Sequence, residues 1–125
     1  MTTVAFDVDD TLFHKVKYMG SESEMPDYRV IDILLWHLGN RDHVIVWSGG
    51  GVDYAQRRAH DLGVLDRVTV VAKGSIRPDI TYDDQEVNLG KVNIKVRREY
   101  LCPHGWTSRD LCPECGGLNE HRTVG

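Results

Sequence analysis

Short apolar runs alternate with segments of helical periodicity along most of this chain. Each run is short and gives way to polar residues, as buried strands of a parallel sheet do. Strands that alternate with helices predict βαβ units and a mostly parallel sheet with helices on both faces, an α/β fold of three layers, α/β/α. The predicted strands are Val4–Val8, His43–Ser48, Val68–Ala72, Ile80–Tyr82 and Val92–Val96, and the predicted helices follow Asp27 and span Val52–Leu62.

The ends of these elements are also marked in the sequence. Asp27 is the expected N-cap of the first helix, in which Ile31 and Leu34 recur at helical spacing, and Gly39 suits its C-terminal cap. The polar segment 14–26 predicts a loop or a small hairpin. Parallel sheets bind ligands at the carboxyl ends of their strands, near a topological switch point. The polar residues that follow the strands are therefore the candidate site.

The charge of the chain limits its partners. The 125 residues carry a net charge of -4, which provides no overall positive field to attract nucleic acid. An anionic substrate must then be held by a local site, to which a divalent cation could add the missing positive charge. No run of about 18 apolar residues occurs, so no membrane span is predicted. Because residues 1–6 lack the pattern of a signal peptide, we expect a cytoplasmic protein.

Two acidic residues, Asp7 and Asp9, flank Val8 at the end of the first predicted strand. Alternate side chains of an extended segment point the same way, so both carboxylates can reach one pocket. Such a pair can bind Mg²⁺, which prefers oxygen ligands. It can also divide the work of phosphoryl transfer, one carboxylate attacking phosphorus while the other, its pKa raised by the neighbouring charge, transfers a proton. The alternative is an ordinary acidic cap between strand and loop.

Four segments, taken in order, resemble the motifs of the haloacid dehalogenase (HAD) superfamily. The first motif of that family, an apolar strand followed by Asp-x-Asp-x-Thr, is matched by Phe6–Leu12, and the second, a strand ending in Ser or Thr, by Val44–Ser48. Lys73 is the best candidate for the third motif, and Ile80–Asp84 matches the acidic pair of the fourth. The resemblance covers roughly the first four-fifths of the chain and implies a Rossmann-like HAD core.

The resemblance implies a role for each motif residue. Asp7 attacks the phosphoryl group and forms an aspartyl-phosphate, and Asp9 acts first as general acid and then as general base. Thr11 steadies the turn that positions Asp9 and belongs to the phosphate-binding group. Lys73 offsets the charge of the nucleophile and of the phosphoryl group, although Arg77 is an alternative source of the cation.

The same resemblance implies a phosphate cradle and a magnesium site. Ser48, together with the free amides of Gly49 and Gly50, holds phosphate oxygens at the start of a helix. Mg²⁺ is held by Asp7, by the main-chain carbonyl of Asp9, and by the acidic pair Asp83 and Asp84. We favour Asp83 as the direct ligand and Asp84 as its support, but spacing alone does not separate them.

No cap domain is expected. Only a short segment separates Leu12 from the first predicted helix, and no sizeable insertion follows Ser48. This resembles the capless HAD group, in which a hairpin after the first motif partly covers the site. An open site admits a large phosphoester, and the resemblance points to a nucleotide or a polynucleotide end, a preference that the charge distribution does not support.

The last quarter of the chain contains all three cysteines. We divide the chain into a catalytic core, residues 1–98, and a tail, residues 99–125. An odd number of cysteines that includes a C-x-x-C pair favours metal binding over disulfides. A structural zinc ion is expected on Cys102, His104, Cys112 and Cys115, with His121 as an alternative to His104. The competing interpretation is free thiols without a metal.

Two functions from different classes remain. The first is a Mg²⁺-dependent phosphomonoesterase that acts on a phosphorylated substrate through Asp7 and Asp9. The second is a catalytically weak HAD-fold scaffold, or a zinc-knuckle adaptor, that binds a partner. A binding module has no need for a second carboxylate, so Asp9 favours the enzyme. The oligomeric state stays open.

Overall fold

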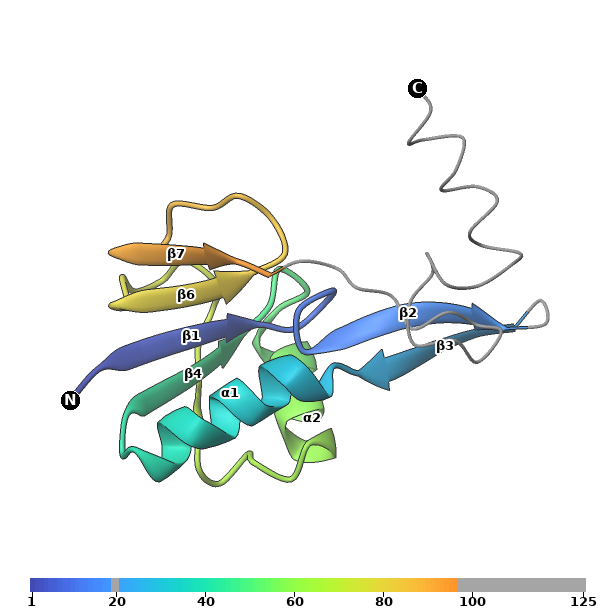
Figure 1. The fold of residues 1–125 in the computed structure, drawn as a ribbon, viewed down its shortest axis with the longest axis horizontal. Helices are drawn as coiled ribbons and strands as arrows, with labels where there is room; N and C mark the ends of the chain where they lie inside the picture. The colour runs from blue at the N-terminus through green and yellow to red at the C-terminus, as the bar shows by residue number, and fades with distance from the viewer. Residues whose placement is uncertain (19–20, 97–125) are drawn as a thin grey trace.

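A parallel sheet of five strands forms the centre of the computed structural model, which describes residues 1–18 and 21–96 (Figure 1). Its strands are β1 (Thr3–Asp7), β4 (His43–Trp47), β5 (Thr69–Val70), β6 (Ile80–Asp83) and β7 (Val92–Lys95). They lie in the order β5-β4-β1-β6-β7, and every neighbouring pair is parallel. The expectation of an α/β fold with a mostly parallel sheet is confirmed.

β1 is the central strand of this sheet. Its residues Val4, Ala5 and Phe6 are fully buried, and the Phe6 ring stacks on that of Tyr82 in β6 with the centroids 4.8 Å apart. Truncating a buried phenylalanine costs about 3–5 kcal/mol, so this contact fixes β1 firmly against its neighbour. The side chains at the carboxyl ends of β1 and β6 are therefore held by a rigid support.

Two helices connect the strands on one side of β1. The first, α1 (Tyr28–Gly39), begins after the predicted N-cap Asp27, whose side chain accepts a hydrogen bond from the Arg29 amide at 3.1 Å. The second, α2 (Val52–Asp61), follows the run of glycines after β4. Within the described residues, no helix combines the length and the apolar character needed to cross a membrane.

Both helices cover the same face of the sheet. The buried cluster between helices and sheet includes the strand residues Val4, Phe6, Val44 and Val46. The opposite face, called the helix-free face below, carries a smaller buried cluster of Ala5, Ile45 and Trp47. Two residues outside the helices and strands, Val71 and Leu89, pack on it. We predicted helices on both faces, and this is wrong for the described residues, which form two layers instead of three.

The position of the helices follows from the strand order. Crossovers between parallel strands of one sheet are right-handed in nearly all proteins. Since α1 leads from β1 to β4 and α2 from β4 to β5, both crossovers move in the same direction and lie on the same face. The return to β6, residues 71–79, begins on the helix-free face with Val71. β5 is shorter than the predicted strand Val68–Ala72, because the chain leaves the sheet after Val70 to begin this return.

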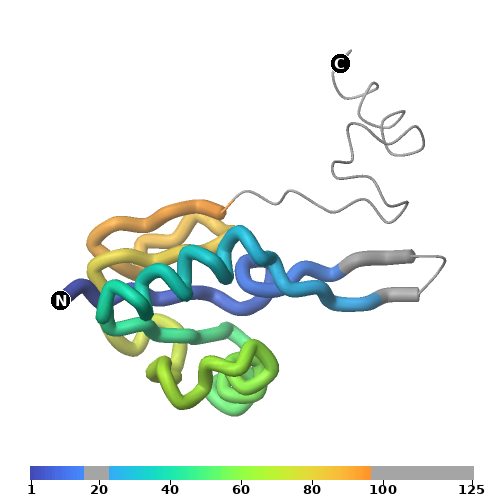
Figure 2. Tube along the Cα trace, turned by 60° about the horizontal axis from the view of Figure 1, so that its bottom comes forward, coloured from blue at the N-terminus to red at the C-terminus, as the bar shows by residue number. Residues whose placement is uncertain are grey.

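An antiparallel hairpin follows β1. Its strands are β2 (Phe13–Tyr18) and β3 (Ser21–Pro26), so the segment predicted as a loop or hairpin is a hairpin. The hairpin projects beyond the carboxyl end of β1, away from the sheet (Figure 1). The N-terminus lies at the opposite end of the sheet, and Figure 2 shows the same arrangement from a second direction.

Candidate functional site

The candidate site lies at the switch point of the sheet. The connections that leave β1 and β6 run in opposite directions, to β4 on one side and to β7 on the other. Sheets of this type bind ligands at such a point, outside the carboxyl ends of the strands. Asp7 is the last residue of β1 and Asp83 the last of β6. Because side chains alternate along a strand, Asp7 shares the helix-free face with Ala5.

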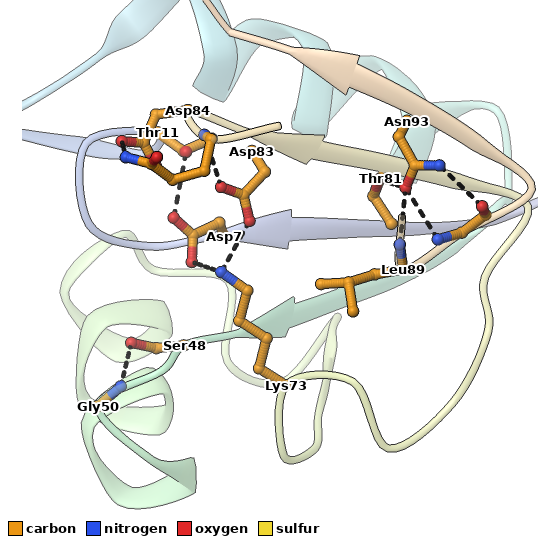
Figure 3. Close-up of polar contacts among 12 residues, drawn as sticks. Asp7, Thr11, Ser48, Gly50, Lys73, Thr81, Asp83, Asp84, Leu89 and Asn93 are labelled. Carbon is orange, nitrogen blue, oxygen red and sulfur yellow. Dashed lines mark hydrogen bonds and ion pairs between the residues drawn. The ribbon is translucent and has the colours of Figure 1, made fainter. Parts of the chain in front are cut away.

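Lys73 reaches the two carboxylates from the return segment that crosses this face. Its Nζ lies 3.0 Å from Oδ1 of Asp7 and 2.7 Å from Oδ2 of Asp83 (Figure 3). Arg77, the alternative cation, instead donates a hydrogen bond to the exposed Asn88 at 3.4 Å. The structure therefore brings Lys73 to Asp7.

A third carboxylate completes a compact group, the carboxylate cluster, made of Asp7, Asp83 and Asp84. One oxygen from each residue lies within 4.8 Å of the others. Asp7 and Asp83 are 5% and 1% exposed, whereas Asp84 is partly exposed. Gln85 holds the acidic pair in place: its amide donates to Oδ1 of Asp83 at 2.9 Å and its side chain to Oδ2 of Asp84 at 3.1 Å.

The cluster carries more negative charge than Lys73 balances. Burial, and then the charge of Asp83, raises the pKa of Asp7 to about 7, although Lys73 acts in the opposite direction. Burial also raises the pKa of Asp84. Burial alone would lower the pKa of Lys73, but its hydrogen bonds to Asp83 and Asp7 raise it, so Lys73 remains an ammonium ion. The Lys73 ammonium group pairs with both Asp7 and Asp83, and a bound cation would add further positive charge to the cluster.

The donor set of the carboxylate cluster suits a hard divalent cation. Mg²⁺ takes oxygen ligands, and proteins usually supply it with one or two carboxylates while substrate and water supply the rest. Within the described residues, the group that could hold a metal consists of aspartates alone. The carboxylate of Asp9, which we predicted to lie beside that of Asp7, is not part of this group.

A tight turn links β1 to the hairpin and brings Thr11 to the site. The carbonyl of Val8 accepts hydrogen bonds from the amides of residues 11–13 at 2.9–3.3 Å. Asp10 has a φ of 62°, a left-handed conformation that aspartate tolerates better than most residues do. The Thr11 hydroxyl is buried and donates to Oδ2 of Asp7 at 3.3 Å, so this residue orients the Asp7 carboxylate directly.

The turn after β4 places Ser48 beside the end of β1. Asp7 is in register with Trp47, the residue before Ser48. The buried hydroxyl of Ser48 accepts a hydrogen bond from the Gly50 amide at 3.0 Å, which leaves the hydroxyl hydrogen able to donate to a ligand. Gly51, the N-cap of α2, has a φ of 106° that favours glycine. Of the two amides predicted to hold phosphate, that of Gly50 bonds to Ser48, while that of Gly49 has no partner among the described residues.

The Asp9 side chain forms a hydrogen bond with Tyr54 of α2, which is in turn contacted by Arg58 of the same helix. Neither residue was singled out by the sequence analysis. The hydroxyl of Tyr54 donates to Oδ1 of Asp9 at 2.5 Å, and Nε of Arg58 donates to the Tyr54 hydroxyl at 3.4 Å. Arg58 also forms an ion pair with Glu24 of the hairpin. Asp9 and Tyr54 are 45 residues apart, and no local pattern marks such a pair.

The predicted zinc ligands lie outside the described residues. These are Cys102, His104, Cys112 and Cys115, with His121 as the alternative ligand. The division of the chain at residue 98 also falls there.

No family model, no curated protein and no solved structure matches this chain. Within the described residues, the sheet edge joins Asp7, Asp83 and Asp84 to Lys73 and Thr11. Ser48 follows the strand next to Asp7. This arrangement offers a buried carboxylate, an ammonium group and a set of oxygen ligands at one edge of the sheet.

Proposed function

We propose that this chain is a Mg²⁺-dependent phosphomonoesterase that acts through an aspartyl-phosphate on Asp7. The observation that carries the proposal is the carboxylate cluster at the switch point of the sheet, with the Lys73 ammonium between Asp7 and Asp83. A carboxylate beside an ammonium group and a metal site is the arrangement that attack on a phosphoryl group requires.

The proposed magnesium ligands are carboxylate oxygens of Asp7, Asp83 and Asp84, together with the main-chain carbonyl of Asp9. The fit rests on the all-oxygen donor set of the cluster. Burial, and then the charge of Asp83, raises the pKa of Asp7 to about 7, and a bound cation would favour the ionised carboxylate. When bound, Mg²⁺ would supply positive charge to the phosphoryl oxygens. Lys73 supplies charge to the same region by itself, and its raised pKa keeps it protonated.

The reaction proceeds in two steps, transfer of the phosphoryl group to Asp7 and then to water. A carboxylate oxygen of Asp7 forms a bond to phosphorus while the bond from phosphorus to the ester oxygen breaks. Asp9 gives a proton to the departing oxygen, which leaves as an alcohol. Asp9 then takes a proton from a water whose oxygen bonds to phosphorus, as the bond from phosphorus to Asp7 breaks. Inorganic phosphate leaves, and both aspartates return to their first state.

Two further features support phosphate binding beside Asp7. The Ser48 hydroxyl accepts from the Gly50 amide, so its hydrogen is available to a phosphoryl oxygen. The amide of Gly49 precedes the start of α2, where the helix dipole favours an anion. Thr11, which holds the Asp7 carboxylate, fixes the attacking group rather than the phosphate.

The proposal includes membership of the capless part of the HAD superfamily. It is supported by the strand order around β1 and by the place of the four motifs at or just after strand ends. The hairpin is the whole of the segment between the turn after β1 and the N-cap of α1, and only residues 48–51 separate β4 from α2. Such a site is open on one side, so we propose a large phosphoester, such as a nucleotide or a polynucleotide end, as the substrate.

The test is hydrolysis of p-nitrophenyl phosphate with Mg²⁺ by the full chain and by three variants. Asp7→Asn should lower kcat/KM by about 10³-fold or more, because the amide is not a nucleophile. Asp9→Asn should lower kcat by about 10²-fold, because the water that attacks the aspartyl-phosphate then lacks its general base. Asp32→Asn, a matched change at an exposed position of α1, should stay within twofold of the wild type. A panel of nucleotides and 5′- or 3′-phosphorylated oligonucleotides then identifies the substrate class. The proposal fails if the wild type is as inactive as Asp7→Asn throughout the panel.

A further inference from the structure

A chain of polar contacts runs from the hairpin to Asp9. Glu24 of β3 forms an ion pair with Arg58, Nε of Arg58 donates to the Tyr54 hydroxyl at 3.4 Å, and that hydroxyl donates to Oδ1 of Asp9 at 2.5 Å. A guanidinium group can only donate, so the Tyr54 oxygen accepts from Arg58 and must use its own hydrogen for Asp9. Tyr54 therefore links the Arg58 guanidinium to the Asp9 carboxylate.

The Tyr54 ring is itself held in place. A Cβ added at Gly50 would lie 3.1 Å from Cδ2 of Tyr54, which means that the ring packs against the bare backbone of the turn after β4. The Arg58 guanidinium also lies close to the ring, 5.6 Å from the centre of the Tyr54 ring and 4.5 Å from that of Phe13. Tyr54 therefore presents its hydroxyl from a fixed position.

Asp9, by contrast, has little else to hold it. Its side chain is exposed, and within the described residues the carboxylate makes one hydrogen bond, through Oδ1 to Tyr54. Oδ2 is consequently left without a hydrogen-bond partner in that part of the chain. An exposed aspartate without such a contact would populate several rotamers.

We propose that Tyr54 is a positioning residue that fixes the Asp9 carboxylate through Oδ1 and so aims Oδ2 at the leaving-group oxygen. This inference rests on the proposed function, because it assigns Tyr54 a part in the proton transfer by Asp9. The hydroxyl of Tyr54 does not touch the substrate. Its effect reaches the reaction through the orientation of Asp9, and a misaimed acid transfers its proton less often.

The test compares two substrates that differ in their need for a proton. Phenyl phosphate has a poor leaving group that must be protonated as it departs, whereas p-nitrophenolate leaves without a proton. The measured quantity is kcat/KM with Mg²⁺, since it reports the steps up to the first phosphoryl transfer and is insensitive to hydrolysis of the aspartyl-phosphate. Tyr54→Phe should lower kcat/KM about tenfold for phenyl phosphate and less than twofold for p-nitrophenyl phosphate.

Two further variants separate positioning from a structural role. Tyr28→Phe removes the hydroxyl of an exposed tyrosine on α1 and should change neither value. In an Asp9→Asn background, Tyr54→Phe should have no additional effect, because its only route to the reaction has been removed. An equal loss on both substrates, or additive losses in the double variant, would overturn the positioning role while the proposed function stands. A wild type that hydrolyses neither substrate would overturn the proposed function, and this inference with it.

Discussion

Two polar groups of side chains lie on the helix-free face, a short distance apart along the same strands (Figure 3). The carboxylate cluster sits at the carboxyl ends of β1 and β6. The second group, the Asn93 network, joins Thr81 of β6 and Asn93 of β7 to the main-chain groups of Leu89 and Gly90 in the loop before β7. The two groups share one sheet face but differ in charge.

The Asn93 network is neutral, and its hydrogen bonds are matched. Oδ1 of Asn93 accepts from the Thr81 hydroxyl at 2.6 Å and from the amides of Leu89 and Gly90 at 3.0 and 2.9 Å. Its Nδ2 donates to the Gly90 carbonyl at 2.8 Å. The loop also comes so close that a Cβ at Gly90 would lie 2.8 Å from Cγ2 of Thr81. Such a network holds a loop to a sheet, and its hydrogen bonds are satisfied without a ligand.

The carboxylate cluster, unlike the Asn93 network, brings groups of like charge together in a buried place. Buried like charges lower stability unless they are paired, and in the part of the chain that the structure describes Lys73 pairs with both Asp7 and Asp83. A group of carboxylates whose pKa values are raised by burial and by one another is typical of a functional site. We therefore assign the two groups different roles, the Asn93 network to the stability of the fold and the carboxylate cluster to the proposed chemistry.

The largest effect that separates the two groups should come from Lys73→Met. Removing the ammonium group takes charge compensation from both Asp7 and the phosphoryl group, so kcat/KM for p-nitrophenyl phosphate should fall by about 10²–10³-fold. Lys91→Met changes an exposed lysine paired with Asp79 and should leave kcat/KM within twofold. If Lys73→Met retained a third of wild-type activity, the carboxylate cluster would resemble the Asn93 network in being structural.

A smaller effect, on stability and not on activity, is expected from Asn93→Ala. The change leaves the Thr81 hydroxyl and two amides without their acceptor, and should lower the free energy of unfolding by about 2–4 kcal/mol in urea denaturation. Under conditions where the variant is folded, kcat/KM should stay within twofold. Asn88→Ala, an exposed asparagine of the same loop, should cost less than about 0.5 kcal/mol. Lost activity in a fully folded Asn93→Ala protein would contradict the separation of roles.

The smallest effect concerns pH in the absence of metal. The pKa of Asp7 is about 7 in the folded chain against an ordinary 3.8, so the folded state binds the proton more tightly than the unfolded state. The stability from this proton is complete below about pH 4 and is lost as pH rises through about 7. In EDTA, the free energy of unfolding should fall by about 2 kcal/mol between about pH 5 and 8.

Two variants sharpen this measurement. Asp7→Asn should lose most of the pH dependence, whereas Asn93→Ala should keep it, because the Asn93 network contains no group that titrates in this range. Added Mg²⁺ should restore stability at about pH 8 in the wild type. An identical pH dependence in wild type and Asp7→Asn would show that the charge of Asp7 does not lower the free energy of unfolding.

Local patterns were enough to predict much of the fold. The apolar runs that became β1 and β4 are continuous, and the cap at Asp27 is a contact between residues two apart. The placement of both helices on one face was not predicted, because it depends on the order of the strands. Once β4 and β5 lie successively on one side of β1, right-handed crossovers leave the other face to a loop.

The candidate site was predictable in part, where its residues end predicted strands. Asp7 and Asp83 could be brought together from sequence because each ends a predicted strand and parallel strands share an edge. The choice between Lys73 and Arg77 required the path of the return segment across the sheet. Tyr54 gave no signal, because its role arises from a contact with Asp9 across two elements.

The central place of β1 has a consequence for how the protein is made. Asp7 lies near the start of the chain, yet Lys73 follows it by 66 residues, and β6, which ends in Asp83, is made later still. Contacts of such long range close large loops and form late in folding. A nascent chain that has emerged only as far as α2 already contains Asp7 and Asp9, but neither the lysine nor the second strand that complete the site. The proposed activity is thus withheld until synthesis has passed β6.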